Sequence, residues 1–263
     1  MFKNLIPRVL TAFALLAIVV PIIWFGGVLR SLVFLGVYGV CIFEIFSCTL
    51  SLPRRPLLIL TLGSLFVPLC VIWLGLEVFF EIFVIYLMIN SLFLILLTEM
   101  LSNRPDITRL VSIPLMALVY PGILLLAAIV IDQRYSGEQI LWVMASVIMA
   151  DTLAYFVGSY AGGKHLAPRI SPNKTVAGSF AGVLGAALMS LAWGTAFAFD
   201  QPVFRLVALG LCIGILAVVG DLFESLLKRS IGVKDMGNSL PGHGGLLDRI
   251  DALLFALPVV FFL

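Results

Sequence analysis

The chain has 263 residues, of which 62% are hydrophobic and 11% charged, with a mean hydropathy of +1.19 and a net charge of +2. Because a soluble domain carries about 25% charged residues, this composition excludes an ordinary soluble protein and predicts an all-α, polytopic integral membrane protein. The net charge is small, so the distribution of charge matters more than its sum, and no nucleic-acid partner is expected. Four cysteines lie in apolar runs without CxxC spacing, which indicates small apolar residues rather than a disulfide or zinc framework.

Apolar stretches of about 20 residues predict transmembrane helices, and the chain contains nine. In chain order they are Val9–Val28, Leu32–Leu52, Leu57–Leu76, Val78–Leu97, Leu110–Ile131, Ile140–Tyr160, Ser179–Phe199, Val203–Leu227 and Leu246–Leu263. The first is too long for a cleaved signal peptide and is expected to be retained.

Positive charges gather in alternate loops of this arrangement. One side carries Lys3, Arg8, Arg54, Arg55, Arg104, Arg109, Lys164, Arg169, Lys174, Lys228, Arg229, Lys234 and Arg249, whereas the other carries Arg30, Arg134 and Arg205. By the positive-inside rule, the amino terminus and the basic segments face the cytoplasm. The sequence therefore predicts a multi-pass protein of the cytoplasmic (inner) membrane with a cytoplasm-facing active site.

The first half, residues 1–131 with five spans, shows little chemistry and is expected to be structural, whereas residues 132–263 form the catalytic region of one membrane domain. Glu44 and Glu81 lie inside predicted spans. They have two interpretations: groups of a proton relay or ion site, or polar groups that pack helices or lie near the end of a span, and the second is favoured.

The second half begins with a polar, small-residue helix face. Asp151, Ala154, Tyr155, Gly158 and Gly162 recur at helical spacing. Small residues allow close helix packing, but packing alone does not explain an Asp at membrane depth. A basic segment, Lys164 to Lys174, follows.

A second polar stripe enters the last predicted loop. Asp221, Glu224, Ser225 and Lys228 share one helix face. Asp221 at membrane depth is expected to have a partner, such as a metal ion or a Lys.

The segment Ser225 to Asp251 holds the densest group of polar side chains in the chain. Its cations suit a polyphosphate, its carboxylates suit magnesium, and Gly242, Gly244 and Gly245 let backbone amides approach an anion. The pattern indicates a metal-assisted phosphate or nucleotide site. The alternative is a solvated loop with ordinary membrane-edge basic residues.

These residues resemble the signature of the phosphatidate cytidylyltransferases, also called CDP-diacylglycerol synthases. The matching positions are Ser225, Lys228, Arg229, Lys234, Asp235, Pro241, His243, Gly244, Gly245, Asp248, Arg249 and Asp251. The family's upstream motif is similar to Asp151, Ala154, Tyr155, Gly163, Lys164, Ile170, Ser171, Pro172, Lys174 and Thr175. The chain departs from it at Ala177, where the family usually has Glu, and this change could reduce activity or alter specificity.

The resemblance implies an enzyme that joins CTP to phosphatidate and releases CDP-diacylglycerol and pyrophosphate for phospholipid biosynthesis. It implies catalytic roles for Asp221, Asp248, Lys228, Arg229 and Lys234. Substrate-binding roles are expected for Lys174, Ser171, Ser225, His243, Gly244, Gly245, Arg249 and Tyr155. Magnesium is expected on Asp221 and Asp248, and with less support on Asp251 and Asp151; Asp235 either binds metal or only orients Lys234.

Two other functions are kept as alternatives. A CTP-dependent polyprenol or phytol kinase would need similar groups, although the complete signature argues against it. A non-catalytic lipid-binding or transport relative is kept open by the intramembrane carboxylates and Ala177, while the one-sided cluster counts against transport. A homodimer and a monovalent cation beside magnesium also stay open.

Overall fold

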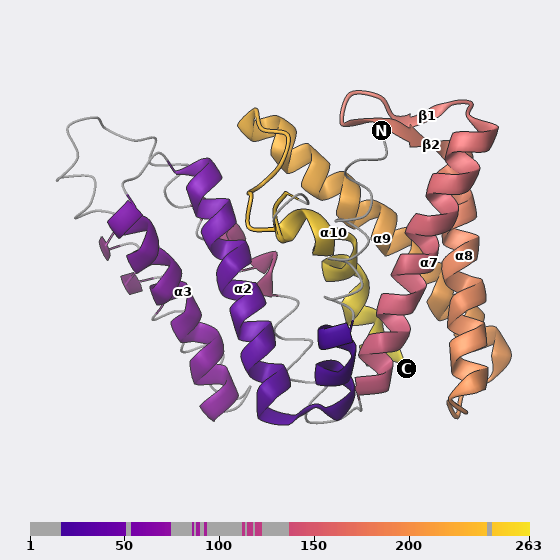
Figure 1. Cartoon of the computed structure of the whole chain (residues 1–263), viewed down its shortest axis with the longest axis horizontal. Coiled ribbons are helices and arrows are strands. Elements are labelled where there is room, and N and C mark those ends of the chain that lie inside the picture. The colour runs from indigo at the N-terminus through magenta and orange to yellow at the C-terminus, as the bar shows by residue number, and fades with distance from the viewer. Residues whose placement is uncertain are drawn as a thin grey trace. The chain divides into compact units, whose positions relative to one another are not determined.

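The structure of the chain is a computed structural model, drawn in Figure 1. It describes residues 17–50, 54–74, 86, 88–89, 92–93, 112–113, 115–117, 119–122, 137–240 and 244–263. Its elements are α2 (Gly27–Thr49), α3 (Arg54–Leu74), α7 (Gly137–Ala161), β1 (His165–Ala167), β2 (Ser171–Thr175), α8 (Val176–Ala196), α9 (Val203–Ile231), α10 (Leu247–Ala256) and the 3₁₀ helix η3 (Leu257–Phe262). Residues 17–25 are also helical.

The chain forms two compact units. The first comprises Met1–Gly27, Val130–Lys234 and Arg249–Leu263, and the second comprises Val28–Ile129 and Asp235–Asp248. The predicted division into a structural region 1–131 and a catalytic region 132–263 stays a prediction.

Four of the described helices, α2, α7, α8 and α9, are long and apolar enough to cross a membrane. The prediction of an α-helical membrane protein is therefore confirmed. The nine spans, the multi-pass arrangement and the cytoplasmic amino terminus stay predictions, and the predicted spans Val78–Leu97 and Leu110–Ile131 lie largely outside the described residues. Helix α9 has 29 residues and is about 43 Å long, which exceeds a hydrocarbon core of about 30 Å.

Arg30 does not lie in a loop as predicted. Gly26 and Gly27 both have φ of +68°, a conformation that glycine adopts without steric cost, and the chain turns there. Helix α2 consequently begins before Arg30, whose side chain is only 3% exposed.

The predicted last span, Leu246–Leu263, is not one continuous α-helix. Helix α10 has ten residues and is followed by the six-residue 3₁₀ helix η3, which has Pro258 in its first turn. Proline lacks the N–H that an α-helix needs and clashes with the preceding turn, so the α-helix ends before it.

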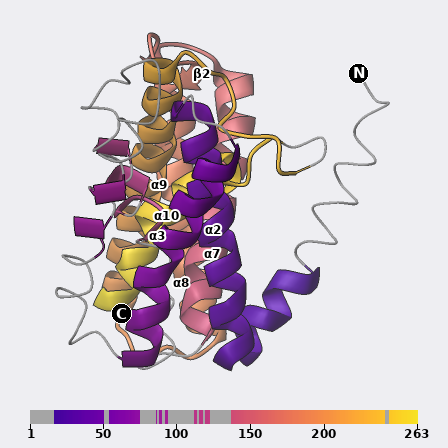
Figure 2. The ribbon, with the colours of Figure 1, turned by 90° about the vertical axis from the view of Figure 1, so that its left-hand side faces the viewer.

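The basic segment after α7 forms a β-hairpin, which the all-α prediction did not include. Strands β1 and β2 are antiparallel, with His165 opposite Thr175 and Ala167 opposite Ser171. Figures 1 and 2 show this hairpin at the end of the helices where α9 also ends. The side chain of Arg229, in the last turn of α9, donates from Nε to the carbonyl oxygen of Ile170 at 3.4 Å.

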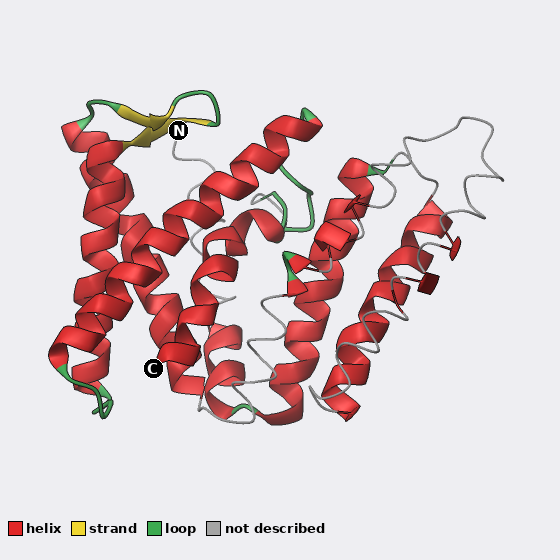
Figure 3. Ribbon diagram, turned by 180° about the vertical axis from the view of Figure 1, so that it is seen from behind, coloured by secondary structure: helices red, strands yellow, loops and turns green. Residues whose placement is uncertain are grey.

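Helices α7, α8 and α9 pack against one another through glycines, and Figure 3 shows them side by side from behind. A Cβ at Gly178 would lie 2.6 Å from the carbonyl oxygen of Ala154, and one at Gly210 would lie 2.6 Å from Cα of Ala187. This close approach confirms the small-residue packing predicted for the α7 face.

Substituting Gly178 with Ala is expected to lower the stability of the protein by about 1–3 kcal/mol, because the added methyl group meets backbone atoms of α7. The melting temperature in detergent should fall by about 2–10 °C. Gly63→Ala in α3 is the matched control, since no atom of the described residues lies within 4 Å of its Cβ position. Equal melting temperatures for the two variants would contradict the tight packing.

In the second unit, α2 and α3 lie side by side. A Cβ at Gly39 of α2 would lie 3.3 Å from the Leu65 side chain of α3. Ser64 and Tyr86 share a buried hydrogen bond of 2.7 Å between their hydroxyl groups. These contacts provide a framework for α2, whose last turns contact Met236, Leu246 and Leu247.

Candidate active site

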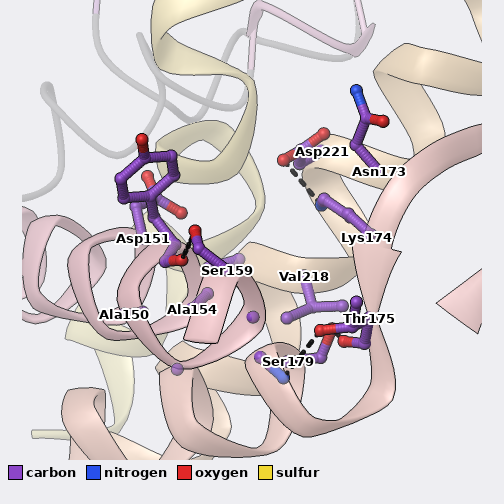
Figure 4. Close-up of a pocket in the computed structure, with 15 residues that line it drawn as sticks. Ala150, Asp151, Ala154, Ser159, Asn173, Lys174, Thr175, Ser179, Val218 and Asp221 are labelled. Atoms are coloured by element: carbon purple, nitrogen blue, oxygen red, sulfur yellow. Dashed lines mark hydrogen bonds and ion pairs between the residues drawn. The ribbon is translucent and has the colours of Figure 1, made fainter. Parts of the chain in front are cut away.

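A pocket of about 530 Å³ opens in the first unit between α7, β2, α8 and α9. Asp151, Ala154, Tyr155 and Gly158 of the predicted α7 face line it, whereas Gly162 follows the end of α7 and does not line it. Figure 4 shows Asp151 and Asp221 on opposite sides of the pocket, with the Lys174 side chain pointing toward Asp221.

Lys174 and Asp221 form an ion pair in this pocket. The distance from Lys174 Nζ to Asp221 Oδ2 is 2.6 Å, and the side chains are 23% and 34% exposed. Ser225 lies one turn further along α9 and donates its hydroxyl to Asp221 Oδ1 at 3.4 Å. The partner expected for Asp221 is therefore present as a Lys, and Ser225 orients the carboxylate.

The amino terminus of α8 also faces the pocket. Thr175 is its N-cap residue: its Oγ1 accepts a hydrogen bond from the Gly178 N–H at 3.1 Å. Thr175, Gly178 and Ser179 line the pocket beside Lys174. Because a helix amino terminus carries partial positive charge, this wall is suited to an anion such as a phosphate. Ala177 lies in the same first turn and is half-buried.

Three carboxylates in the first unit influence one another electrostatically. Asp151 and Asp251 are both repelled by Asp221, while Lys174 attracts Asp151 and Lys228 attracts Asp251. Gly220 lets α10 approach α9, since a Cβ there would lie 2.6 Å from the backbone oxygen of Asp251. Because Gly220 has no side chain, the Asp251 carboxylate can lie closer to Asp151 and Asp221.

These carboxylates are suited to magnesium, which prefers oxygen ligands and is usually held by one or two carboxylates together with substrate phosphates. Across the described ranges, however, no three His, Cys, Asp or Glu side chains are grouped so that they could hold a metal ion. The described residues therefore fit a magnesium ion whose coordination is completed by oxygens of a phosphate substrate, rather than an ion coordinated by protein side chains alone.

The predicted phosphate-binding cations lie at the end of α9 and beyond it. Lys228 pairs with the buried Glu224 one turn earlier, and Arg229 is exposed. Both are in the last turn of α9, where cations stabilise the helix dipole. Lys234 and Arg249 are exposed. Ser171 begins β2 and, like Lys234 and Arg249, does not line the pocket, whereas Tyr155 does.

The signature residues from Asp235 to Asp248 belong to the second unit. Asp248 Oδ2 accepts hydrogen bonds from the N–H groups of Met236 and Gly245, each at 3.0 Å. Gly244 has φ of +84°, which favours glycine. Asp235 is exposed and lies near Gly244, and His243 lies outside the described residues. In this structure Asp248 organises its own loop.

Sequence reasoning assigned no role to four polar residues that line the pocket: Ser159, Asn173, Thr175 and Ser179. Asn173 and Thr175 flank Lys174 in the upstream motif, so their position beside a selected residue was an available signal. Ser159 and Ser179 showed no such signal, because their role depends on how α7 and α8 pack.

The fold and the pocket together define a class: an α-helical membrane protein with a pocket lined by charged and polar side chains. The profile of the cytidylyltransferase family matches residues 6–263, and the chain belongs to this family.

Relatives of the chain include several phosphatidate cytidylyltransferases. The one from Brucella abortus is 32% identical over 268 residues, covering 98% of this chain and 93% of the relative. Those from Bacillus subtilis and Helicobacter pylori are 40% and 37% identical over 130 and 137 residues. These two alignments cover about half of each protein, 48% and 51% of the relatives' lengths.

Proposed function

We propose that this protein transfers the cytidylyl group of CTP to phosphatidate and produces CDP-diacylglycerol and pyrophosphate. The observation that carries the proposal is the pocket in which Lys174, paired with Asp221, lies beside the amino terminus of α8. Two sources of positive charge there suit phosphate groups. Membership of the cytidylyltransferase family and the similarity to phosphatidate cytidylyltransferases support this choice of reaction.

In this reaction a phosphate oxygen of phosphatidate attacks the α-phosphorus of CTP. A new P–O bond forms, the bond from the α-phosphorus to the oxygen that bridges to the β-phosphorus breaks, and pyrophosphate leaves with that electron pair. The lipid phosphate is already an anion, so no Ser, Cys or His nucleophile is needed. The protein's task is to hold the two substrates in line and to neutralise charge, which Lys174 and the α8 amino terminus are suited to do.

Magnesium would be held by Asp221 and Asp248, with Asp251 and Asp151 as further ligands or as charges that favour the ion. When bound, it would neutralise triphosphate charge and polarise the reacting phosphoryl group. The nearness of Asp151, Asp221 and Asp251 within the first unit supports this proposal, because a cation would be attracted to the three carboxylates together. An accompanying monovalent cation remains a secondary proposal.

The remaining signature residues are proposed to bind phosphate groups. Lys228, Arg229, Lys234 and Arg249 supply positive charge, and Gly244 and Gly245 supply backbone N–H groups. Ser171, Ser225, Tyr155 and His243 are proposed as neighbouring substrate contacts. We also propose nine spans, a cytoplasm-facing site in the inner membrane, and a homodimer; the one-sided distribution of Lys and Arg supports the orientation.

The test uses purified protein in detergent with phosphatidate, magnesium and CTP labelled at either the α- or the γ-phosphorus. Cytidylyl transfer moves the α-label into the lipid fraction and leaves the γ-label in pyrophosphate. ATP, GTP and UTP serve as controls for the base.

The two labels separate the proposal from its main alternative. A CTP-dependent polyprenol or phytol kinase would move the γ-label, and not the α-label, into its lipid. Neither label in lipid, under conditions in which the Bacillus subtilis relative is active, would indicate a non-catalytic or transport relative and overturn the proposal.

A further inference from the structure

The feature that the proposed reaction leaves unexplained is Glu44 of α2. Its side chain is 1% exposed and lies in an apolar helix, between Ile42 and Ile45, which are fully buried. A carboxylate in such a place is costly unless it is hydrogen-bonded.

Glu44 is hydrogen-bonded to the signature. Oε1 accepts from the N–H of Leu246 at 2.8 Å, and Oε2 accepts from the N–H of Leu247 at 2.9 Å. Leu247 is the first residue of α10. Two of the N–H groups that a helix leaves unsatisfied at its start are thus satisfied by a side chain from a distant part of the chain, and the negative charge complements the helix dipole.

Two glycines make room for this carboxylate. A Cβ at Gly237 would lie 2.7 Å from Cγ and from Oε1 of Glu44, and a Cβ at Gly245 would lie 3.0 Å from Oε2. Both distances are too short for any larger residue without displacing the carboxylate or the loop. The loop is therefore built around the Glu44 side chain.

The same helix holds the other end of the loop. Cys48, one turn after Glu44, donates its thiol to the carbonyl oxygen of Met236 at 2.7 Å. The N–H of Met236 in turn donates to both oxygens of Asp248, at 3.2 and 3.0 Å. Helix α2 thus contacts residue 236 directly and residues 246–247 through Glu44, and Asp248 joins the two ends.

We infer that Glu44 is a positioning residue for the reaction: it fixes residues 236–237 and 244–248 so that Asp248 and the Gly244–Gly245 backbone are held in one arrangement. This inference rests on the proposed function, in which those groups bind metal and phosphate. It gives α2, in the half of the chain that the sequence marked as structural, a direct part in ordering the signature.

The test compares Glu44→Gln with the wild-type protein. Gln has one acceptor oxygen and replaces the other with an NH₂ group that faces an N–H donor, so one amide of the pair loses its partner. We expect kcat/KM for CTP to fall about tenfold or more, when the rate is normalised to the amount of monodisperse protein. Hydrogen exchange at Leu246 and Leu247 should accelerate, while exchange in α7, α8 and α9 stays unchanged.

Two further variants complete the comparison. Gly237→Ala displaces the same carboxylate by steric contact, so it should reproduce the faster exchange and the loss of activity, and combining it with Glu44→Gln should add little. Thr49→Ala is the control: Thr49 lies on the same helix and its hydroxyl donates to the backbone oxygen of Ile45 within α2. It should keep full activity and normal exchange.

Normal exchange at Leu246 and Leu247 in Glu44→Gln would overturn the inference. The inference would also be overturned if Glu44→Gln gave less folded protein but each folded molecule kept the wild-type activity. If the wild-type protein transfers no cytidylyl group, the proposed function fails, whereas faster exchange in Glu44→Gln and Gly237→Ala would still support the anchoring of the loop by Glu44.

Discussion

Lys174→Ala is expected to lower kcat/KM for cytidylyl transfer by about 10²–10³-fold, the range seen when one group that stabilises transition-state charge is removed. Among the described residues, Lys174 is the cation that lines the pocket, 2.6 Å from Asp221 and next to the amino terminus of α8. Its loss removes charge where the triphosphate is proposed to bind. Initial rates with labelled CTP, at several phosphatidate concentrations, measure the effect.

Arg169→Ala is the matched control for Lys174, because it removes an exposed cation from the turn of the same hairpin. It should retain wild-type activity. Lys174→Arg should recover part of the rate, since it keeps the charge but changes its geometry. A fully active Lys174→Ala variant would remove the pocket from the proposed mechanism.

Asp248→Asn is expected to reduce turnover by about 10²–10³-fold or more while the protein stays folded and monodisperse in detergent. The substitution removes the charge proposed to hold magnesium. It also puts an NH₂ group where one oxygen now accepts from the N–H groups of Met236 and Gly245. Turnover should be measured across a magnesium titration, because a lost ligand raises the magnesium concentration that half-maximal activity requires.

The control for Asp248 is Asp200→Asn, an exposed carboxylate between α8 and α9. It should leave both turnover and the magnesium requirement unchanged. If Asp248→Asn kept the wild-type rate, the metal assignment would be wrong. If it lost activity with an unchanged magnesium requirement, Asp248 would act through its loop, as its two hydrogen-bonded amides allow.

Local pattern predicted the parts of the site that lie on single helices. The spacing of Asp221 and Ser225 placed both on one face of α9, and the structure joins them by a hydrogen bond. The spacing of Asp151, Ala154 and Gly158 predicted a small, polar face of α7, and those residues line the pocket. Periodicity succeeds here because a helix fixes which residues share a face.

The pattern failed where the deciding contact is not local. The segment that forms β1 and β2 is short and polar, so it shows no strand periodicity, and its pairing depends on a turn. Arg30 was placed in a loop because hydropathy reports charge and not burial. The signature spacing likewise pointed to metal binding by Asp248, but not to the amides of Met236 and Gly245 that it accepts from.

The sequence by itself determined that this is an apolar helical protein with one dense set of phosphate- and cation-binding residues, and it identified the family. Only the tertiary structure decided which of these residues meet: Lys174 with Asp221, and Glu44 with the first amides of α10. Composition and spacing are properties of the local chain. The partner of a buried charge, in contrast, is set by the packing of segments far apart in sequence, where glycines such as Gly220 and Gly237 leave room for it.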